Sequence, residues 1–306
     1  MKGWRNQAAS ARAGQALRDP RRIVRAMTAP THRYVTLDGT EIHYTEWGDP
    51  DATPLVCVHG LSRHGRDFDP LAAALADEYR VLCPDMPGRG ESEWDPDQYD
   101  AASLSNIIVG FFEELGLTDA HYLGLSMGGQ LGIGVVAGPL ADRVRRLVLV
   151  DIGPDPDDDD TADEGVQRII DYLTNPPAFD ALTELEAYFR DVYDTFSPMT
   201  DAEWRRLTRT SARRTEDGQF APNYDTRIVE PLLLGDSDGP DQWAQFDAID
   251  QPVMTVKAEH SDILSDATFA EMRERKPDME TLGVDCGHAP ALNVPEQTEP
   301  IREFLD

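Results

Sequence analysis

The five residues Gly124-Leu125-Ser126-Met127-Gly128 could build a nucleophilic serine. The serine directly follows an apolar run, 121–125, that predicts a strand, and the motif precedes a run, 130–136, that predicts a helix. A serine at such a junction needs an abrupt turn that raises its hydroxyl above the sheet, and side chains two residues away on either side would collide in that turn. Glycine at both positions relieves the collision. We therefore predict that Ser126 is a nucleophile for acyl transfer.

A nucleophilic serine needs a general base, and histidine is the usual one. Of the seven histidines, His288 in Gly287-His288-Ala289-Pro290 follows the last predicted strand and lies at the correct edge of the sheet. His59 ends a strand beside Gly60, where a structural role is expected. The others are expected at structural or surface positions (His32, His43, His121) or are minor candidates (His64, His260). We predict His288 as the base.

The base needs an orienting carboxylate, and two aspartates compete for this role. Asp262 follows the predicted strand 253–256, whereas Asp151 directly ends the strand 147–150. Either carboxylate would emerge at the catalytic edge. In such sheets the acid commonly comes from the later strand, so we prefer Asp262 and expect Asp151 to be a helix cap or a loop anchor. Glu259 is a weaker rival because it follows its strand too closely.

Negative charge on the attacked carbonyl oxygen must meet preorganised hydrogen-bond donors. The backbone N–H of Met127, at the start of the helix after the serine, is one expected donor, and the helix dipole adds a favourable potential. The second is expected in the loop His59-Gly60-Leu61-Ser62, where the backbone N–H of Leu61 follows the strand 55–58. These two amides form the predicted oxyanion hole.

The order of predicted elements indicates an α/β fold. Residues 34–37 and 42–47 alternate apolar and polar side chains around Asp38-Gly39, which predicts a hairpin. Short apolar runs then alternate with segments of helical spacing, which is typical of parallel strands that helices cover on both faces. The expected strands are 55–58, 81–83, 121–125, 147–150, 252–256 and 279–284, and the expected helices are 70–76, 101–115, the stretch after Ser126, 265–275 and 299–305.

Three regions are expected along the chain. Residues 1–32 form a basic arm, and residues 33–151 with 246–306 form the α/β core. Between them, residues 152–245 form a helical insertion, with an aspartate run at its start that should be a solvated loop and helices over 167–173, 182–193 and 202–210. No function follows for the arm, which could be a targeting segment, an anion-binding segment or a helix lying on the acidic body.

Composition excludes several classes of partner. The 306 residues include 57 Asp and Glu against 28 Lys and Arg, a formal charge of −29. Such a surface repels nucleic acids and anionic membranes. The apolar stretch 8–17 is interrupted by polar residues, so we expect no export signal. The three cysteines, Cys57, Cys83 and Cys286, are expected to be thiols in a reducing cytoplasm.

The acidic surface contains very little lysine. Lys2, Lys257 and Lys276 are the only lysines, so arginine supplies nearly all the positive charge. This composition is typical of proteins from salty environments, although high-GC coding bias alone favours arginine over lysine. We expect a salt-tolerant fold whose melting temperature rises from low to molar NaCl, because salt screens the self-repulsion of the acidic surface.

The chain resembles the α/β-hydrolase superfamily, in particular its esterases, lipases and C–C hydrolases with a helical cap. The motifs that carry the resemblance are His59-Gly60-Leu61, Pro84-Asp85-Met86-Pro87-Gly88-Arg89-Gly90-Glu91-Ser92, Gly124-Leu125-Ser126-Met127-Gly128-Gly129, the loop bearing Asp262, and Gly287-His288. The resemblance implies an eight-stranded, mostly parallel sheet, a cap inserted after the sixth strand, and an acyl-enzyme intermediate with no metal or organic cofactor. The segment 84–92 matches a structural turn of the family.

Serine at position 126 argues against the dehalogenases and epoxide hydrolases of this fold, which use aspartate there. Our first choice is a carboxylesterase for uncharged, apolar esters of short to medium chain length, because residues 152–245 are rich in aromatic side chains. The alternatives are a C–C bond hydrolase or a lactonase on the same triad, and a non-catalytic ligand-binding module. A C–C hydrolase would need cationic groups for a substrate carboxylate, which Arg63, Arg66, Arg190 or Arg205 could supply.

Overall fold

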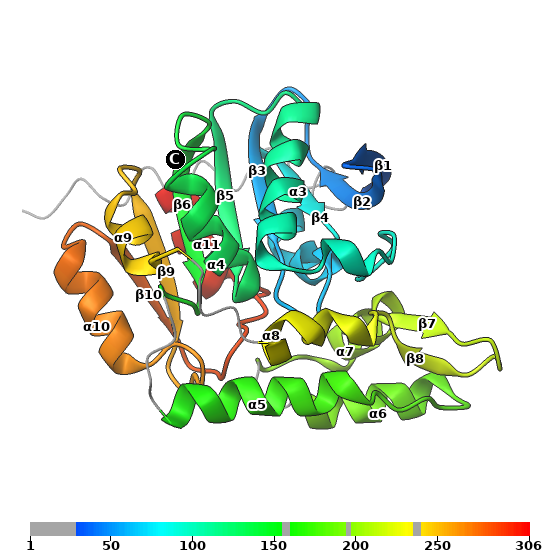
Figure 1. Cartoon of the computed structure of the whole chain (residues 1–306). Coiled ribbons are helices and arrows are strands. Elements are labelled where there is room, and N and C mark those ends of the chain that lie inside the picture. The colour runs from blue at the N-terminus through cyan, green and yellow to red at the C-terminus, as the bar shows by residue number, and fades with distance from the viewer. Residues whose placement is uncertain (1–28, 155–159, 194–196, 235–239) are drawn as a thin grey trace, which may run out of the picture.

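The computed structural model describes residues 29–154, 160–193, 197–234 and 240–306 (Figure 1). Residues 1–28 of the predicted basic arm lie outside these ranges, and so do the aspartates at 157–159. Within the described ranges, no helix combines the length and the apolar character that crossing a membrane requires.

A single eight-stranded sheet forms the centre of the molecule, in the order β1-β2-β4-β3-β5-β6-β9-β10. Its strands are β1 (Thr31–Leu37), β2 (Thr40–Trp47), β3 (Thr53–Val58), β4 (Tyr79–Pro84), β5 (Ala120–Leu125), β6 (Val144–Val150), β9 (Val253–Ala258) and β10 (Glu280–Val284). β2 runs antiparallel to β1 and β4, whereas the other pairings are parallel. The predicted fold class is confirmed.

The first two strands form the predicted hairpin. Leu37 pairs with Thr40, so the turn has two central residues, Asp38 with a φ of 51° and Gly39 with a φ of 88°. A two-residue turn of this kind needs positive φ at both positions, which aspartate tolerates and glycine adopts without strain. The turn therefore fixes the register of β1 against β2.

Helices cover both faces of the sheet and divide the core into two clusters. In β3, Val56 and Val58 pack against the helices of one face, while Leu55 and Cys57 pack against those of the other. This burial on both faces explains why the parallel strands are continuous apolar runs. One face carries α3 (Ala101–Glu114), α4 (Met127–Val136), α9 (Gln242–Asp247) and α10 (Asp266–Arg275), and the other carries α2 (Asp69–Leu75) and α11 (Pro295–Leu305).

Between β6 and α9 the chain leaves the sheet and forms a separate group of elements at one end of it (Figure 1). This inserted segment contains α5 (Asp160–Thr174), α6 (Leu182–Val192), α7 (Asp201–Thr210), the short hairpin β7 (Ala212–Arg214) and β8 (Phe220–Pro222), and α8 (Glu230–Leu234). It contacts the loops that follow β3 and β9: Tyr172 hydrogen-bonds Ser62 in the first, and Arg168 pairs with Asp262 in the second. The inserted segment thus lies over the carboxyl ends of the strands.

The helix α9 spans the predicted end of the insertion at residue 245, and Phe246, on the core side of that boundary, is fully buried against one face of the sheet. One expected helix boundary was wrong. The closing helix starts at Pro295 rather than Glu299, so Pro300 lies inside it and not in its first turn. Proline suits the first turn because no helical N–H is lost there, and Pro295 occupies that place.

Candidate active site

Ser126 sits in a strained turn between β5 and α4. Its φ of 51° and ψ of −120° are unusual for a residue with a side chain. A Cβ atom at Gly124 would overlap the backbone of Gly128 and Gly129, and one at Gly128 would overlap the carbonyl of Val58. Glycine at both positions is therefore a steric requirement of this turn, as the motif predicts.

The structure brings Ser126, His288 and Asp151 into a hydrogen-bonded chain. Nε2 of His288 lies 2.9 Å from Oγ of Ser126, and Nδ1 lies 2.8 Å from Oδ2 of Asp151. Because an aspartate carboxylate only accepts, Nδ1 carries the hydrogen and Nε2 presents a lone pair to the serine. His288 can therefore accept the hydroxyl proton, which is the geometry of a general base.

Asp151 is fully buried directly after β6 and is held by three donors. The backbone N–H of Ala258 donates to Oδ1 over 2.9 Å, and the hydroxyl of Ser261 donates to Oδ2 over 2.5 Å, beside the bond from His288. A buried carboxylate needs such donors to offset the loss of hydration. They fix its orientation toward the imidazole.

The prediction that Asp262 orients His288 is wrong in this structure. The Asp262 carboxylate instead accepts hydrogen bonds of 3.0 and 2.7 Å from the guanidinium of Arg168 on α5. Its side chain is 34% exposed, so it joins the loop after β9 to the inserted segment at the surface. The competing candidate Asp151, expected to be only a cap or anchor, holds the position beside the imidazole.

The loop after β9 still contributes to the chain of hydrogen bonds, through a different residue. Ser261 donates to Asp151 while its hydroxyl oxygen accepts from the amides of Ile263 and Leu264, at 3.1 and 3.0 Å. The loop therefore closes around its own serine and directs Asp262 outward. Both aspartates follow strands that end at the same edge, so the sequence alone did not separate them.

The two predicted oxyanion-hole segments pack tightly against each other and against Ser126. A Cβ atom at Gly60 would lie 3.5 Å from Cβ of Ser126, and one at Gly128 would overlap the end of β3. Met127 is the first residue of α4, and amides in the first turn of a helix have no carbonyl partner within that helix. The amides of Leu61 and Met127 thus come from segments that meet beside the serine. Their role as oxyanion donors stays a prediction.

Arg89 fixes the Leu61 loop through a hydrogen bond to its backbone. The sequence did not indicate this role. This fully buried arginine donates from Nε to the carbonyl of Leu61 over 2.9 Å and from Nη1 to the carbonyl of Pro87 over 2.6 Å. Burial lowers the pKa of Arg89 to about 10, so the guanidinium stays charged near neutral pH. The guanidinium also lies over the ring of Tyr99, 5.5 Å from its centroid.

His59 is structural, as expected from its place beside Gly60. Its Nδ1–H donates to the carbonyl of Gly60 over 2.7 Å, and its Nε2 accepts from the backbone N–H of Met86 over 2.9 Å. The neutral ring therefore joins the loops after β3 and β4. Burial lowers the pKa of His59 to about 4, although the Gly60 carbonyl favours the protonated form.

This buried histidine should make the fold sensitive to acid. Unfolded histidine binds a proton near pH 6.5, whereas folded His59 stays neutral down to about pH 4, so the unfolded state binds more protons between these values. Stability should therefore fall as the pH drops from about 6.5 to 4, by up to about 3 kcal/mol from this residue. Urea unfolding at pH 7, 6 and 5 measures the change, and a free energy of unfolding that stays constant would contradict it.

A cavity lies between the core and the inserted segment, lined by the chain neighbours of Ser126 and His288. Its apolar lining includes Leu125 beside the serine, Ala289 beside the base, and Tyr193, Met199 and Leu207 of the inserted segment. Arg63, Arg66 and Arg206 also line it. Arg63 is buried and is bound by both oxygens of the Asp67 carboxylate, at 2.6 and 2.5 Å.

Fold and site together define a hydrolase with a serine, histidine and aspartate arrangement above a mostly parallel sheet. A family model described as "Alpha/beta hydrolase family" matches residues 55–301. The chain belongs to the α/β hydrolase family.

Relatives extend the match over most of the chain. The 3-hydroxybutyrate-oligomer hydrolase of Cupriavidus necator is 37% identical over 275 residues, which cover 86% of this chain and 92% of that protein. An esterase of Mycobacterium tuberculosis is 26% identical and covers 85% of each chain. A solved α/β hydrolase from Novosphingobium aromaticivorans is 32% identical, with a TM-score of 0.79 over 91% of this chain and 99% of that one.

Proposed function

We propose that this hydrolase is a serine carboxylesterase that works through an acyl-enzyme intermediate. The observation that carries the proposal is the continuous hydrogen-bonded chain from Ser126 through His288 to the buried carboxylate of Asp151. This arrangement supports nucleophilic catalysis because each group prepares the next for its step.

In the first half of the proposed reaction, His288 Nε2 takes the hydroxyl proton as Ser126 Oγ attacks the ester carbonyl carbon. The amides of Leu61 and Met127 then stabilise the oxyanion. Collapse of the tetrahedral intermediate expels the alcohol, which receives the proton from His288. Water, activated by the same imidazole, hydrolyses the acyl-enzyme and releases the acid. Asp151 holds the imidazole and balances its transient positive charge.

We further propose that the inserted segment is a cap that selects the substrate. Leu125, which precedes Ser126, lines the cavity on the core side. Tyr193, Met199 and Leu207 of the inserted segment line it on the other side, so much of its wall is apolar. An acyl or alcohol group of short to medium length would bury apolar surface there. The expected substrate is therefore a small carboxylic ester.

The relative from Cupriavidus necator suggests one substrate of this class. Oligomers of 3-hydroxybutyrate are chains of esters of a short hydroxy acid, and each free oligomer ends in a carboxylate. Of the arginines that line the cavity, Arg63 and Arg66 are paired with Asp67 and Asp69, so we propose Arg206 as the cationic group for such an end. We propose these oligomers as candidates beside uncharged esters.

A substrate panel tests the proposal. Purified protein should hydrolyse p-nitrophenyl esters, with a rate that peaks at short or medium acyl length, and the same preparation is assayed with the dimer and trimer of 3-hydroxybutyrate. Ser126→Ala serves as the control for contaminating esterases. A lactone and a vinylogous diketone acid represent the alternatives on the same triad. Turnover of the diketone acid without turnover of any ester would contradict the esterase proposal and favour a C–C hydrolase.

A further inference from the structure

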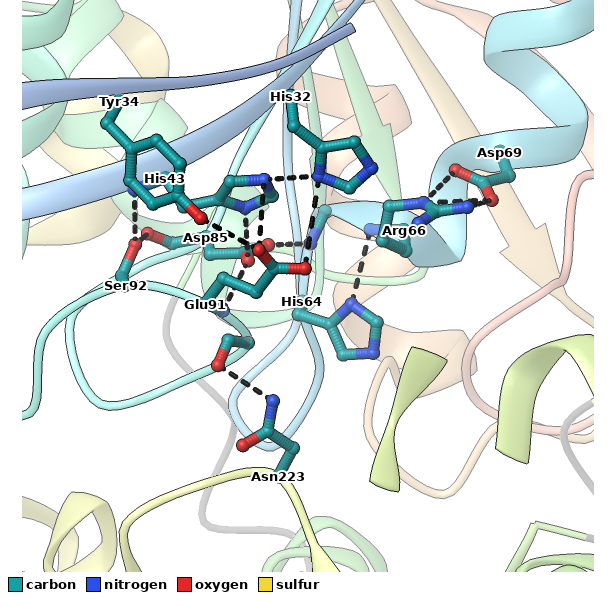
Figure 2. Close-up of polar contacts among 12 residues, drawn as sticks. His32, Tyr34, His43, His64, Arg66, Asp69, Asp85, Glu91, Ser92 and Asn223 are labelled. Carbon is teal, nitrogen blue, oxygen red and sulfur yellow. Dashed lines mark hydrogen bonds and ion pairs between the residues drawn. The ribbon is translucent and has the colours of Figure 1, made fainter. Parts of the chain in front are cut away.

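A second cluster of polar side chains lies on the β1–β2 hairpin, apart from the catalytic residues (Figure 2). Nδ1 of His32 on β1 lies 2.8 Å from Nε2 of His43 on β2. The Glu91 carboxylate completes the group, with one oxygen 3.9 Å from Nδ1 of His32 and the other 3.9 Å from Nε2 of His43. Among the described residues, this is the one group of three whose ligand atoms are close enough to share a metal ion.

Buried contacts fix the orientation of His43. Its side chain is fully buried, and its Nδ1 lies 2.8 Å from Oδ2 of Asp85. The same carboxylate accepts from the amides of Gly65 and Glu91, at 2.7 and 2.9 Å. With the hydrogen on Nδ1, Nε2 of His43 presents its lone pair to His32 and Glu91. A carboxylate behind a histidine is the usual outer partner of a metal-binding imidazole.

Glu91 is also oriented, although it lies at the surface. The hydroxyl of Tyr34 donates to its Oε2 over 2.8 Å, from the same strand as His32 (Figure 2). The side chains of His32 and Glu91 are 39% and 51% exposed, so both have room to adjust. One ligand is thus rigid and two can shift, which suits a site that closes around an ion.

The distances are close to those of a metal site. Zinc bound to nitrogen at about 2.0–2.1 Å in a tetrahedral arrangement separates two ligand atoms by about 3.3 Å. The two nitrogens of the cluster are closer than this and the carboxylate oxygens are farther away. Opening the imidazole pair by about 0.5 Å would give the nitrogen–nitrogen distance. The two 3.9 Å distances involve different oxygens of Glu91, and one oxygen lies within 4.8 Å of both nitrogens, so the exposed carboxylate must also turn and move inward to bring one oxygen to both.

We propose that His32, His43 and Glu91 form a binding site for a divalent transition-metal ion such as Zn²⁺. Two imidazoles and one carboxylate favour such an ion over Mg²⁺ or Ca²⁺, which prefer oxygen ligands. In the absence of metal, His32 donates from Nδ1 to His43; on binding, its hydrogen moves to Nε2 so that Nδ1 can ligate. Water from the exposed side supplies the fourth position.

The proposed ion would join three separate segments: β1, β2 and the loop after β4. That loop also contains Arg89, two residues before Glu91, which holds the carbonyl of Leu61. Its Gly90 amide donates to the carbonyl of Asn223 in the inserted segment, over 3.2 Å, and the Asn223 side chain donates back over 2.8 Å. The ion would therefore stabilise the loop that connects the hairpin, the inserted segment and the predicted oxyanion hole.

Isothermal titration calorimetry of the full chain with ZnCl₂, after removal of metals with EDTA, tests the site directly. We expect one Zn²⁺ per chain and no comparable binding of MgCl₂. Loss of an outer partner of a ligand typically lowers metal affinity by roughly 10- to 100-fold. His32→Ala and Glu91→Gln each remove a ligand itself, so each should lower the Zn²⁺ affinity by at least as much. Residues 1–28 contain neither histidine nor cysteine, so they add no such ligand.

Two control variants distinguish Zn²⁺ binding at this site from nonspecific attraction of Zn²⁺ to the acidic surface. Glu93→Gln removes the same charge two residues away, on an exposed side chain outside the cluster, and His260→Ala removes an exposed histidine paired with Asp285. Both should bind Zn²⁺ as the unmodified chain does. Melting curves in EDTA establish that each variant is folded. Absence of 1:1 binding, or equal affinity in His32→Ala, Glu91→Gln and the controls, overturns the proposal.

Discussion

Replacing Ser126 by alanine should lower kcat for p-nitrophenyl esters by roughly 10⁴- to 10⁶-fold, because the acyl-enzyme can no longer form. The substitution removes one oxygen from a turn whose backbone is fixed by the glycines on either side, so the fold should be retained. Steady-state kinetics measure the loss. Labelling of the unmodified chain by a fluorophosphonate should disappear in the variant.

The behaviour of the double variant gives a sharper test of the same prediction. In the proposed mechanism Ser126 and His288 act as one unit, so His288→Ala should lower kcat nearly as much as Ser126→Ala, and the double variant should lose little more. Losses that simply multiply would show that the two residues act independently. Such a result would count against the serine mechanism even if each single variant were inactive.

Asp151→Asn should lower kcat by about 10⁴-fold while leaving the fold intact. With the asparagine oxygen in the place of Oδ1, it can still accept from the Ala258 amide, but the NH2 group in the place of Oδ2 cannot accept from His288 Nδ1 or from Ser261. The imidazole would then carry its hydrogen on Nε2 and present no lone pair to the serine. Steady-state kinetics with the best ester of the panel, together with melting curves, measure both effects.

Asp262→Asn is the matched control, because it makes the same change on the other aspartate that the sequence offered. It removes only a partly exposed ion pair with Arg168, so kcat should change by less than about tenfold. If Asp262→Asn lost more activity than Asp151→Asn, the carboxylate beside His288 in the structure would not be the one that supports catalysis.

The elements that the sequence predicted share a physical origin. Strands buried on both faces must be apolar throughout, and the nucleophile turn tolerates only glycine at two fixed positions, so the signals for β5, Ser126 and α4 are local. The position of His288 after the last strand follows from the same sheet. These features need no knowledge of how distant segments pack.

The features that the sequence did not predict depend on packing between distant segments. Asp151 and Asp262 both follow strands that end at the same edge, and only the course of the loop around Ser261 directs one inward and the other outward. Arg89 likewise reaches Leu61 across 28 positions. No local pattern encodes such contacts.

The histidine cluster lies between these two cases. The two-residue turn at Asp38-Gly39 sets Tyr34 opposite His43, so His32 must be a diagonal neighbour of His43 on the same face of the hairpin. This pair was therefore deducible from the hairpin alone. The third member, Glu91, comes from a loop after another strand, and only the structure places it there.

The position of Asp151 directly after β6 has a consequence for which loops can vary. Because β6 pairs directly with β5, one strand–helix–strand unit carries both the proposed nucleophile Ser126 and the proposed acid Asp151. The loop after β9 is then required for support through Ser261 but not for a catalytic carboxylate. Its outward part, with the Arg168–Asp262 pair, contributes no group to the hydrogen-bonded chain of Ser126, His288 and Asp151, so changes there should alter contact with the inserted segment more than the proposed catalytic step.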